Sequence, residues 1–160
     1  MDASKGCDQM LEFYQKYKEK HGSDLQLVIL GRSMLTIPEN RDIHYLGFVS
    51  DEDKMTAIAG AKYLWLPSKF ESLSIALLEG LAQGVPGIVN GNCEVLKGHA
   101  IRSQAAFYYH NWEEFELCMT KMCQMTDEKY HFMSENAIRY VNDNYCWERI
   151  EEKLKNIIER

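Results

Sequence analysis

The chain has 160 residues, 46% of them hydrophobic, and a formal net charge of −6 at pH 7. This length is sufficient for one domain with a hydrophobic core, and the composition is typical of a globular protein. The negative balance argues against nucleic acid or an anionic membrane as a partner, so any anionic ligand must be held by local positive groups. The sequence has neither an apolar run of about 20 residues, as a membrane helix requires, nor a secretory signal. We therefore expect a cytoplasmic protein.

The cysteines and histidines indicate no metal site. The five cysteines form no C-x-x-C pair, and their odd number leaves at least one thiol without a disulfide partner. The five histidines have no ligand spacing with one another or with cysteine. We expect reduced thiols and neither a structural zinc ion nor a catalytic metal.

Short apolar runs alternate with helix-like stretches along the whole chain. Helical spacing predicts a helix over residues 5–21, and Ser50 followed by Asp53 has the spacing of a helix start. Nearly continuous apolar runs are typical of buried parallel strands. We expect strands at 25–31, 43–49, 61–67, 85–90 and 105–110, and helices at 71–83, 112–125 and 127–142.

This alternation predicts an α/β fold, a Rossmann-like doubly wound parallel sheet flanked by helices, formed by residues 1–160 as one domain. The N-terminal loop enters a helix without the strand that normally precedes such a loop, which suggests the C-terminal piece of a longer protein. On that interpretation, part of a terminal apolar stripe lacks its natural cover, and the isolated domain is expected to self-associate. The stripe consists of Trp147, Ile150, Leu154 and Ile157.

Residues 67–87 contain the most informative pattern. Glu79 lies within a mainly apolar helix, where a carboxylate needs hydrogen-bond donors such as the two hydroxyls of a ribose. Glu71 lies in front of that helix, and the N-terminal amides of Leu73, Ser74 and Ile75 suit a phosphate. Carboxylate, amides and carboxylate thus match the sugar, diphosphate and ribose of a nucleotide sugar. Taken alone, the spacing of the two glutamates favours ordinary exposed residues, and the surrounding sequence reverses that interpretation.

Three motifs extend this pattern: P-S-x-x-E-S-x-x-x-x-L-L-E-G-L-A-x-G-V-P, I-x-Y-L-G-F-V-S-D-E-D-K and S-K-G-C-D. With weaker matches further on, they resemble the C-terminal domain of retaining glycosyltransferases of the GT-B fold, the group 1 or family 4 enzymes. The resemblance implies that Glu71 contacts the transferred sugar, that Glu79 holds the ribose and that Lys5 neutralises phosphate oxygens. It implies base contacts by Phe48 and Val49, and diphosphate binding by the amides of Ser72, Leu73, Ser74 and Ile75.

Other residues leave alternatives open. Lys5 could be a solvated lysine, and Lys54 could line the same pocket or lie on the surface. Ser74 stands where many members of the family have glycine, and Gly87 replaces a common aliphatic residue. Arg32 stands where the family often has a small or acidic residue, and no role is assigned to it. Lys97 and His99 are expected in a loop and are likewise given no role. The arginine that usually precedes the lysine has no counterpart in this sequence.

The resemblance implies the donor-binding domain of a retaining, metal-independent glycosyltransferase of the hexosyltransferase type. It would use a nucleotide-diphosphate sugar as donor and need no cofactor, and its acceptor would be a glycan or glycolipid. The N-terminal acceptor domain, through which any peripheral membrane association would occur, is not in this sequence, so the isolated chain is expected to be inactive. The alternative is a catalytically silent glycosyltransferase-like domain that acts as a protein-interaction module. A nucleotide-sugar epimerase would need catalytic histidine and acidic groups that we cannot place.

Overall fold

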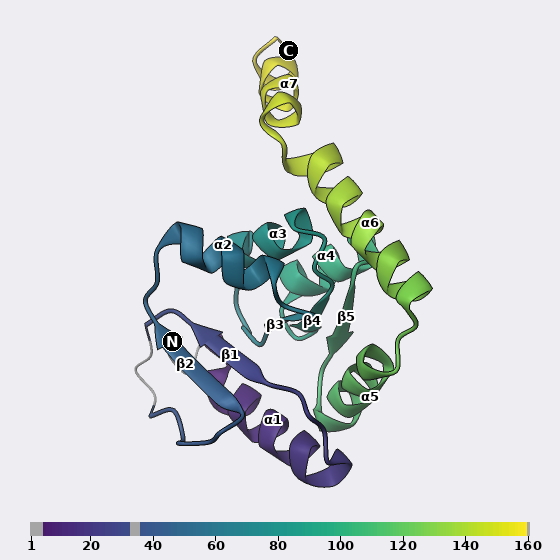
Figure 1. The fold of residues 1–160 in the computed structure, drawn as a ribbon. Helices are drawn as coiled ribbons and strands as arrows, with labels where there is room; N and C mark the ends of the chain where they lie inside the picture. Colours follow the sequence, from purple (N-terminus) through teal and green to yellow (C-terminus); the bar gives the residue numbers. More distant parts are fainter. Residues whose placement is uncertain (1–4, 33–35, 160) are drawn as a thin grey trace.

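A computed structural model of the protein describes residues 5–32 and 36–159. Its elements alternate as expected, and all five predicted strands are present within or at the predicted bounds (Figure 1). In chain order they are α1 (Cys7–His21), β1 (Leu27–Leu30), β2 (Ile43–Gly47), α2 (Asp51–Ala59), β3 (Leu64–Leu66), α3 (Ile75–Ala82), β4 (Gly87–Asn90), α4 (Glu94–Ser103), β5 (Ala106–Tyr109), α5 (Trp112–Cys123), α6 (Asp127–Tyr145) and α7 (Trp147–Ile158).

All the strand pairs are parallel, which confirms the predicted α/β class, but the strands divide into two sheets. β1 pairs with β2, while β3, β4 and β5 form a second sheet in that order. In the second sheet Leu64 lies opposite Gly87, and Gly87 lies opposite Ala106. Because the strands of this sheet are parallel, the loops that follow β3 and β4 leave from the same edge, at the carboxyl ends of the strands.

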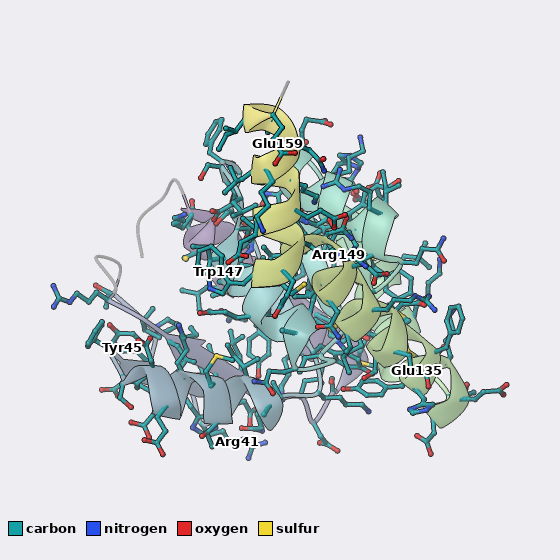
Figure 2. All side chains as sticks on the ribbon, turned by 90° about the horizontal axis from the view of Figure 1, so that it is seen from above. Arg41, Tyr45, Glu135, Trp147, Arg149 and Glu159 are labelled. Atoms are coloured by element: carbon teal, nitrogen blue, oxygen red, sulfur yellow. The ribbon has the colours of Figure 1, made fainter. Side chains whose placement is uncertain are left out.

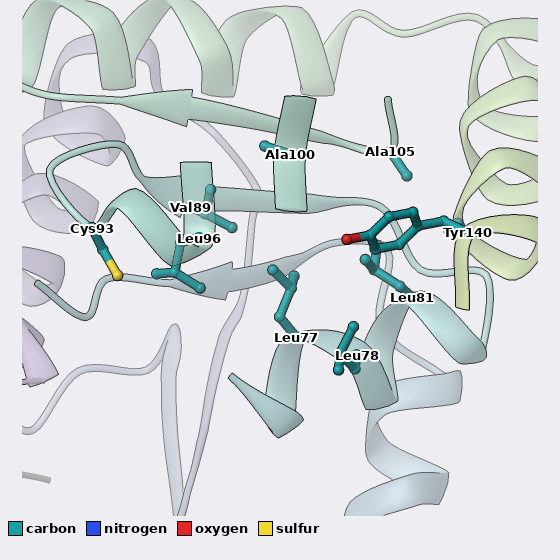
Figure 3. Close-up of a cluster of buried hydrophobic side chains, with 10 residues drawn as sticks. Leu77, Leu78, Leu81, Val89, Cys93, Leu96, Ala100, Ala105 and Tyr140 are labelled. Carbon is teal, nitrogen blue, oxygen red and sulfur yellow. The ribbon is translucent and has the colours of Figure 1, made fainter. Parts of the chain in front are cut away.

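Helices cover both faces of the three-stranded sheet. On one face α3, α4 and α6 pack their apolar side chains onto Val89 (Figure 3). On the other face α1 and α5 enclose Ile88 in an aromatic cluster, in which Trp65 stacks on Phe115 with their ring centroids 4.5 Å apart. Ile88 and Val89 are adjacent, so their opposite directions follow from the two-residue repeat of a strand. The arrangement is the doubly wound packing that the sequence predicts.

Two helical predictions differ from the structure. The helix expected at 71–83 begins only at Ile75, because Ser74 has left-handed backbone angles (φ 59°, ψ 66°) that a right-handed helix cannot contain. The segment with Lys97 and His99, expected as a loop, is helix α4, and it buries Leu96, His99 and Ala100 on one face. Gly98 lies within this helix and obscures its pattern in the sequence, since glycine has a poor helix propensity.

Helix α7 has none of its residues buried. It follows α6 after an extended residue, Cys146, and projects away from the rest of the domain (Figure 1; Figure 2 views the molecule from that side). Trp147 and Ile157 are 73% and 71% exposed, so the predicted apolar stripe is largely uncovered. Among the described residues, none of the helices has both the length and the apolar character needed to cross a membrane.

Candidate functional site

The candidate site lies where β3 and β4 end. In open α/β folds, ligands bind beyond the carboxyl ends of the strands, and the loop from Pro67 to Ser74 leaves β3 at this edge. The buried side chain of Asn90, the last residue of β4, holds this loop in place. Its Nδ2 donates to the Pro67 carbonyl oxygen at 2.9 Å, and its Oδ1 accepts hydrogen bonds from the backbone and side chain of Asn92.

Gly6 brings the N-terminal loop against the same segment. Its φ is +70°, and a Cβ added to it would lie 2.2 Å from the Pro67 carbonyl oxygen. Only a glycine allows this approach, since every other residue carries a Cβ and is strained at that φ. Lys5 Nζ consequently lies 2.9 Å from Glu71 Oε1, in an ion pair whose carboxylate side is largely shielded at 15% exposure. The structure thus brings together Glu71, which the resemblance assigns to the transferred sugar, and Lys5, which it assigns to the phosphate.

The N-terminus of α3 follows Glu71 after three residues, Ser72 to Ser74. In the part of the chain that the structure describes, the backbone amides of Ser74 and Ile75 donate to no protein acceptor. Such amides carry part of the positive end of the helix dipole and suit an anion. Ser72 and the side chain of Ile75 are exposed, and Leu73 is 42% exposed. The four positions predicted to bind a diphosphate therefore form one loop and helix start.

Glu79 begins the last turn of α3 and is paired with Lys54 from α2. The Lys54 Nζ lies 2.8 Å from Glu79 Oε1 and 3.2 Å from Asp51 Oδ1. These two hydrogen bonds, with Glu79 the stronger influence, raise the pKa of Lys54, which remains charged. Glu79 is partly exposed, at 25%, so its carboxylate is within reach of a ligand. Of the two alternatives that the sequence allowed for Lys54, a residue at the site or an unrelated surface lysine, its contact with Glu79 supports the first.

Phe48 and Val49 follow β2 at the corresponding edge of the smaller sheet. The Phe48 ring is 76% exposed, and the guanidinium of Arg32, just after β1, lies 5.3 Å from its centre. This is a cation–π contact between two residues that the sequence treats separately. It leaves an aromatic surface at the position assigned by resemblance to the base.

His99 lies in helix α4 and not in the loop that the sequence predicted. Its side chain is 1% exposed and lies beneath the α3 N-terminus, between the Leu73 carbonyl oxygen and the Tyr140 hydroxyl, each 2.9 Å away. Burial, and secondarily the positive charge of Arg102, lower the pKa of His99 despite its hydrogen bond to Leu73. Lys97 instead forms an ion pair with Glu94 of the same helix, at 3.8 Å.

The candidate site therefore comprises two ion pairs, Lys5–Glu71 and Lys54–Glu79, with unpaired amides between them along the chain. A hollow of about 600 Å³ lies elsewhere, beside Ile43 at the start of β2, and neither glutamate lines it. Sequence reasoning missed Asn90 and Gly6 as supports of the site. A polar residue that ends an apolar strand, and a glycine beside the lysine, were the available signals.

Comparisons with known proteins place these features in a family. The family model described as "Glycosyl transferases group 1" matches residues 1–140. The comparison with curated proteins gives no match. Among solved structures, the glycosyltransferase WaaG of lipopolysaccharide biosynthesis aligns with a TM-score of 0.72 and 18% identity over 94% of this chain and 42% of its own.

Two further solved structures have the same fold. Sucrose-phosphate synthase from Thermosynechococcus elongatus aligns with a TM-score of 0.77 and 15% identity, over 99% of this chain and 42% of its own. Anabaena HepE, solved with UDP-glucose, aligns with a TM-score of 0.78 and 11% identity, over 99% of this chain and 46% of its own. The chain thus spans less than half the length of these solved proteins. At such identities the likeness establishes the GT-B fold alone.

Proposed function

Because the chain belongs to the group 1 glycosyl transferases, we propose that it binds a nucleotide-diphosphate sugar and presents the sugar for retaining transfer to a glycan or glycolipid acceptor. The observation that carries the proposal is the set of unpaired amides at Ser74 and Ile75, which lie along the chain between two carboxylates that are each paired with a lysine. HepE, a solved structure of the same fold, is described in complex with UDP-glucose.

The chemistry follows from the charge of the leaving group. As the bond to the sugar breaks, negative charge develops on the diphosphate, and pre-positioned amides and Lys5 would stabilise it. Glu71, already held by Lys5, would accept hydrogen bonds from the sugar hydroxyls. Glu79 would accept hydrogen bonds from the ribose hydroxyls, with Lys54 paired to its carboxylate, and the exposed face of Phe48 would meet the base. These roles require neither a metal ion nor a cofactor.

We further propose that the domain acts as half of a longer protein and is inactive alone. The solved relatives extend well beyond the aligned part. In the described residues, β1 pairs only with β2 and β3 only with β4, so each of these strands has an edge that could accept a further parallel strand.

A nucleotide titration tests the donor site. We expect the protein to bind one of UDP, GDP and ADP, and Glu79→Gln to weaken that binding about tenfold through loss of a charge-assisted hydrogen bond. The matching 2′-deoxynucleotide should bind both proteins similarly, because it lacks a hydroxyl that Glu79 would hold. Calorimetry measures all four affinities.

Glu116→Gln is the matched control, since it also removes a carboxylate from a lysine pair, on helix α5. It should leave nucleotide affinity unchanged. If the unaltered protein binds none of the three nucleotides at millimolar concentration, the donor-binding proposal fails and the interaction module is favoured. Sugar transfer by the isolated chain would contradict only its proposed inactivity.

The exposed stripe of α7 leads to a separate prediction. Trp147, Leu154 and Ile157 are 51–73% exposed, and burying them between two copies would remove apolar surface from water. We expect a concentration-dependent dimer, with a dissociation constant raised at least tenfold by Trp147→Ser. Sedimentation velocity measures it. Phe132→Ser, which alters an exposed aromatic residue of α6, should not affect the dimer. A monomer at all concentrations would contradict the prediction.

A further inference from the structure

A chain of hydrogen bonds connects the buried side of the donor loop to helices α4 and α6. His99 Nε2 lies 2.9 Å from the Leu73 carbonyl oxygen, and His99 Nδ1 lies 2.9 Å from the Tyr140 hydroxyl. The Tyr140 hydroxyl is also 3.2 Å from Arg102 Nε and 3.4 Å from the Tyr145 hydroxyl. The proposed function uses none of these side chains.

The donor and the acceptor of each hydrogen bond in this series are determined by the groups at its two ends, the Leu73 carbonyl and the Arg102 guanidinium. The Leu73 carbonyl can only accept, so His99 Nε2 carries the proton and donates to it. Nδ1 of the neutral imidazole must then accept, so the Tyr140 hydroxyl donates to it and accepts in turn from Arg102. The hydrogen bonds are therefore donated in one direction, from Arg102 to Tyr140, from Tyr140 to His99 and from His99 to the Leu73 carbonyl oxygen of the loop.

We propose that His99 is a positioning residue that holds the Leu73–Ser74 peptide so that the Ser74 amide faces the diphosphate. The peptide unit is planar and trans, so its N–H is directed opposite to its carbonyl. While His99 binds the Leu73 oxygen, the Ser74 N–H is directed away from α4. If the peptide turned over, a carbonyl oxygen would replace that amide and repel an anion. The inference rests on the proposed function, because it takes the diphosphate as the ligand.

The backbone at Ser74 shows why such a restraint is needed. Its φ of +59° is unfavourable for a residue with a Cβ, and rotation of the preceding peptide would relieve the strain. In addition, the Ser74 hydroxyl is buried and has no hydrogen-bond partner among the described residues. Serine at this position therefore favours the turned-over peptide, and the His99 bond opposes that tendency.

The test compares two substitutions of His99. Leucine removes both hydrogen bonds, whereas glutamine offers an amide N–H for Leu73 and an oxygen for Tyr140. We expect His99→Leu to weaken binding of the nucleoside diphosphate and of inorganic pyrophosphate about tenfold and to leave the nucleoside unaffected. His99→Gln should restore most of the diphosphate affinity. A purely structural role would weaken all ligands alike.

Two further variants keep the test decisive if His99→Leu does not fold. Tyr140→Phe removes the donor to Nδ1, together with the hydroxyl contacts to Arg102 and Tyr145, and leaves the bond of His99 to Leu73 in place. It should weaken diphosphate binding a few-fold, whereas Tyr130→Phe, elsewhere on α6, should not. Ser74→Gly removes the strain, so His99→Leu should cost less affinity in that background than alone. Equal losses in both backgrounds, or equal losses for nucleoside and diphosphate, would overturn the inference while leaving the donor site intact. If the unaltered protein binds neither pyrophosphate nor a nucleotide, both proposals fail.

Discussion

Replacing Gly6 with alanine is expected to destabilise the domain by about 3–4 kcal/mol, the sum of a left-handed backbone penalty and a backbone clash. The added Cβ would lie 2.2 Å from the Pro67 carbonyl oxygen, and neither backbone can move without disturbing its strand or helix. The free energy of unfolding in urea, measured by circular dichroism, gives the value.

Gly22 provides a matched control at the other end of α1. Its φ is also positive, at +57°, but an added Cβ would have no neighbour within 4 Å. Gly22→Ala should therefore cost only about 1 kcal/mol, from strain alone. Equal losses for the two variants would show that the contact of Gly6 with Pro67 does not determine the stability of this region. The same contact places Lys5 beside Glu71, so Gly6→Ala should also weaken pyrophosphate binding.

Replacing Asn90 with aspartate is expected to cost about 3–5 kcal/mol at pH 7, although the side chains have nearly the same shape. Asn90 is completely buried and donates its amide to the Pro67 carbonyl. In aspartate, the oxygen that replaces Nδ2 would face the Pro67 carbonyl oxygen with no proton to donate and no solvent, while the other oxygen would still accept from Asn92. Urea unfolding measures the loss. Asn111→Asp is the control, because Asn111 caps α5 through its side-chain oxygen, which aspartate also provides.

The Asn90→Asp deficit should depend on pH in a defined direction. Burial favours the neutral acid, so the introduced carboxyl has a higher pKa in the folded than in the unfolded state. The folded state then binds the proton more tightly, and stability relative to the parent is regained as the pH falls towards about 4. The protonated acid can also donate to Pro67. A deficit that stays constant between pH 7 and pH 4 would argue against a buried carboxylate.

The sequence predicts the strands and most helices because their signals are local. The Ser50 cap is a clear case, since its Oγ accepts a hydrogen bond from the Asp53 amide at 3.0 Å, as the Ser–Asp spacing indicates. The failures occur where a local rule conflicts with packing. Ser74 adopts a conformation that favours glycine, and α4 contains Gly98, so neither the start of α3 nor α4 itself could be read from periodicity.

The candidate site was predictable only in part. The residue pattern indicated Glu71 and Glu79, and the resemblance added Lys5. Nothing in their spacing shows that Lys5 and Glu71, or Lys54 and Glu79, form ion pairs. Those contacts depend on how α1, α2 and α3 pack around the sheet. Asn90 and His99 are single polar residues in apolar surroundings, and their roles emerge only when Pro67 and Leu73 are seen beside them.

The division of the parallel strands into two sheets affects how the isolated domain behaves in concentrated solution. β1 and β3 each pair on one side only in the described residues, so each leaves a row of backbone amide and carbonyl groups open. Such a row can template a strand from another molecule, which is a route to aggregation. Warming or crowding should therefore produce β-rich precipitates, and substitutions in α7 that abolish the dimer should not prevent them.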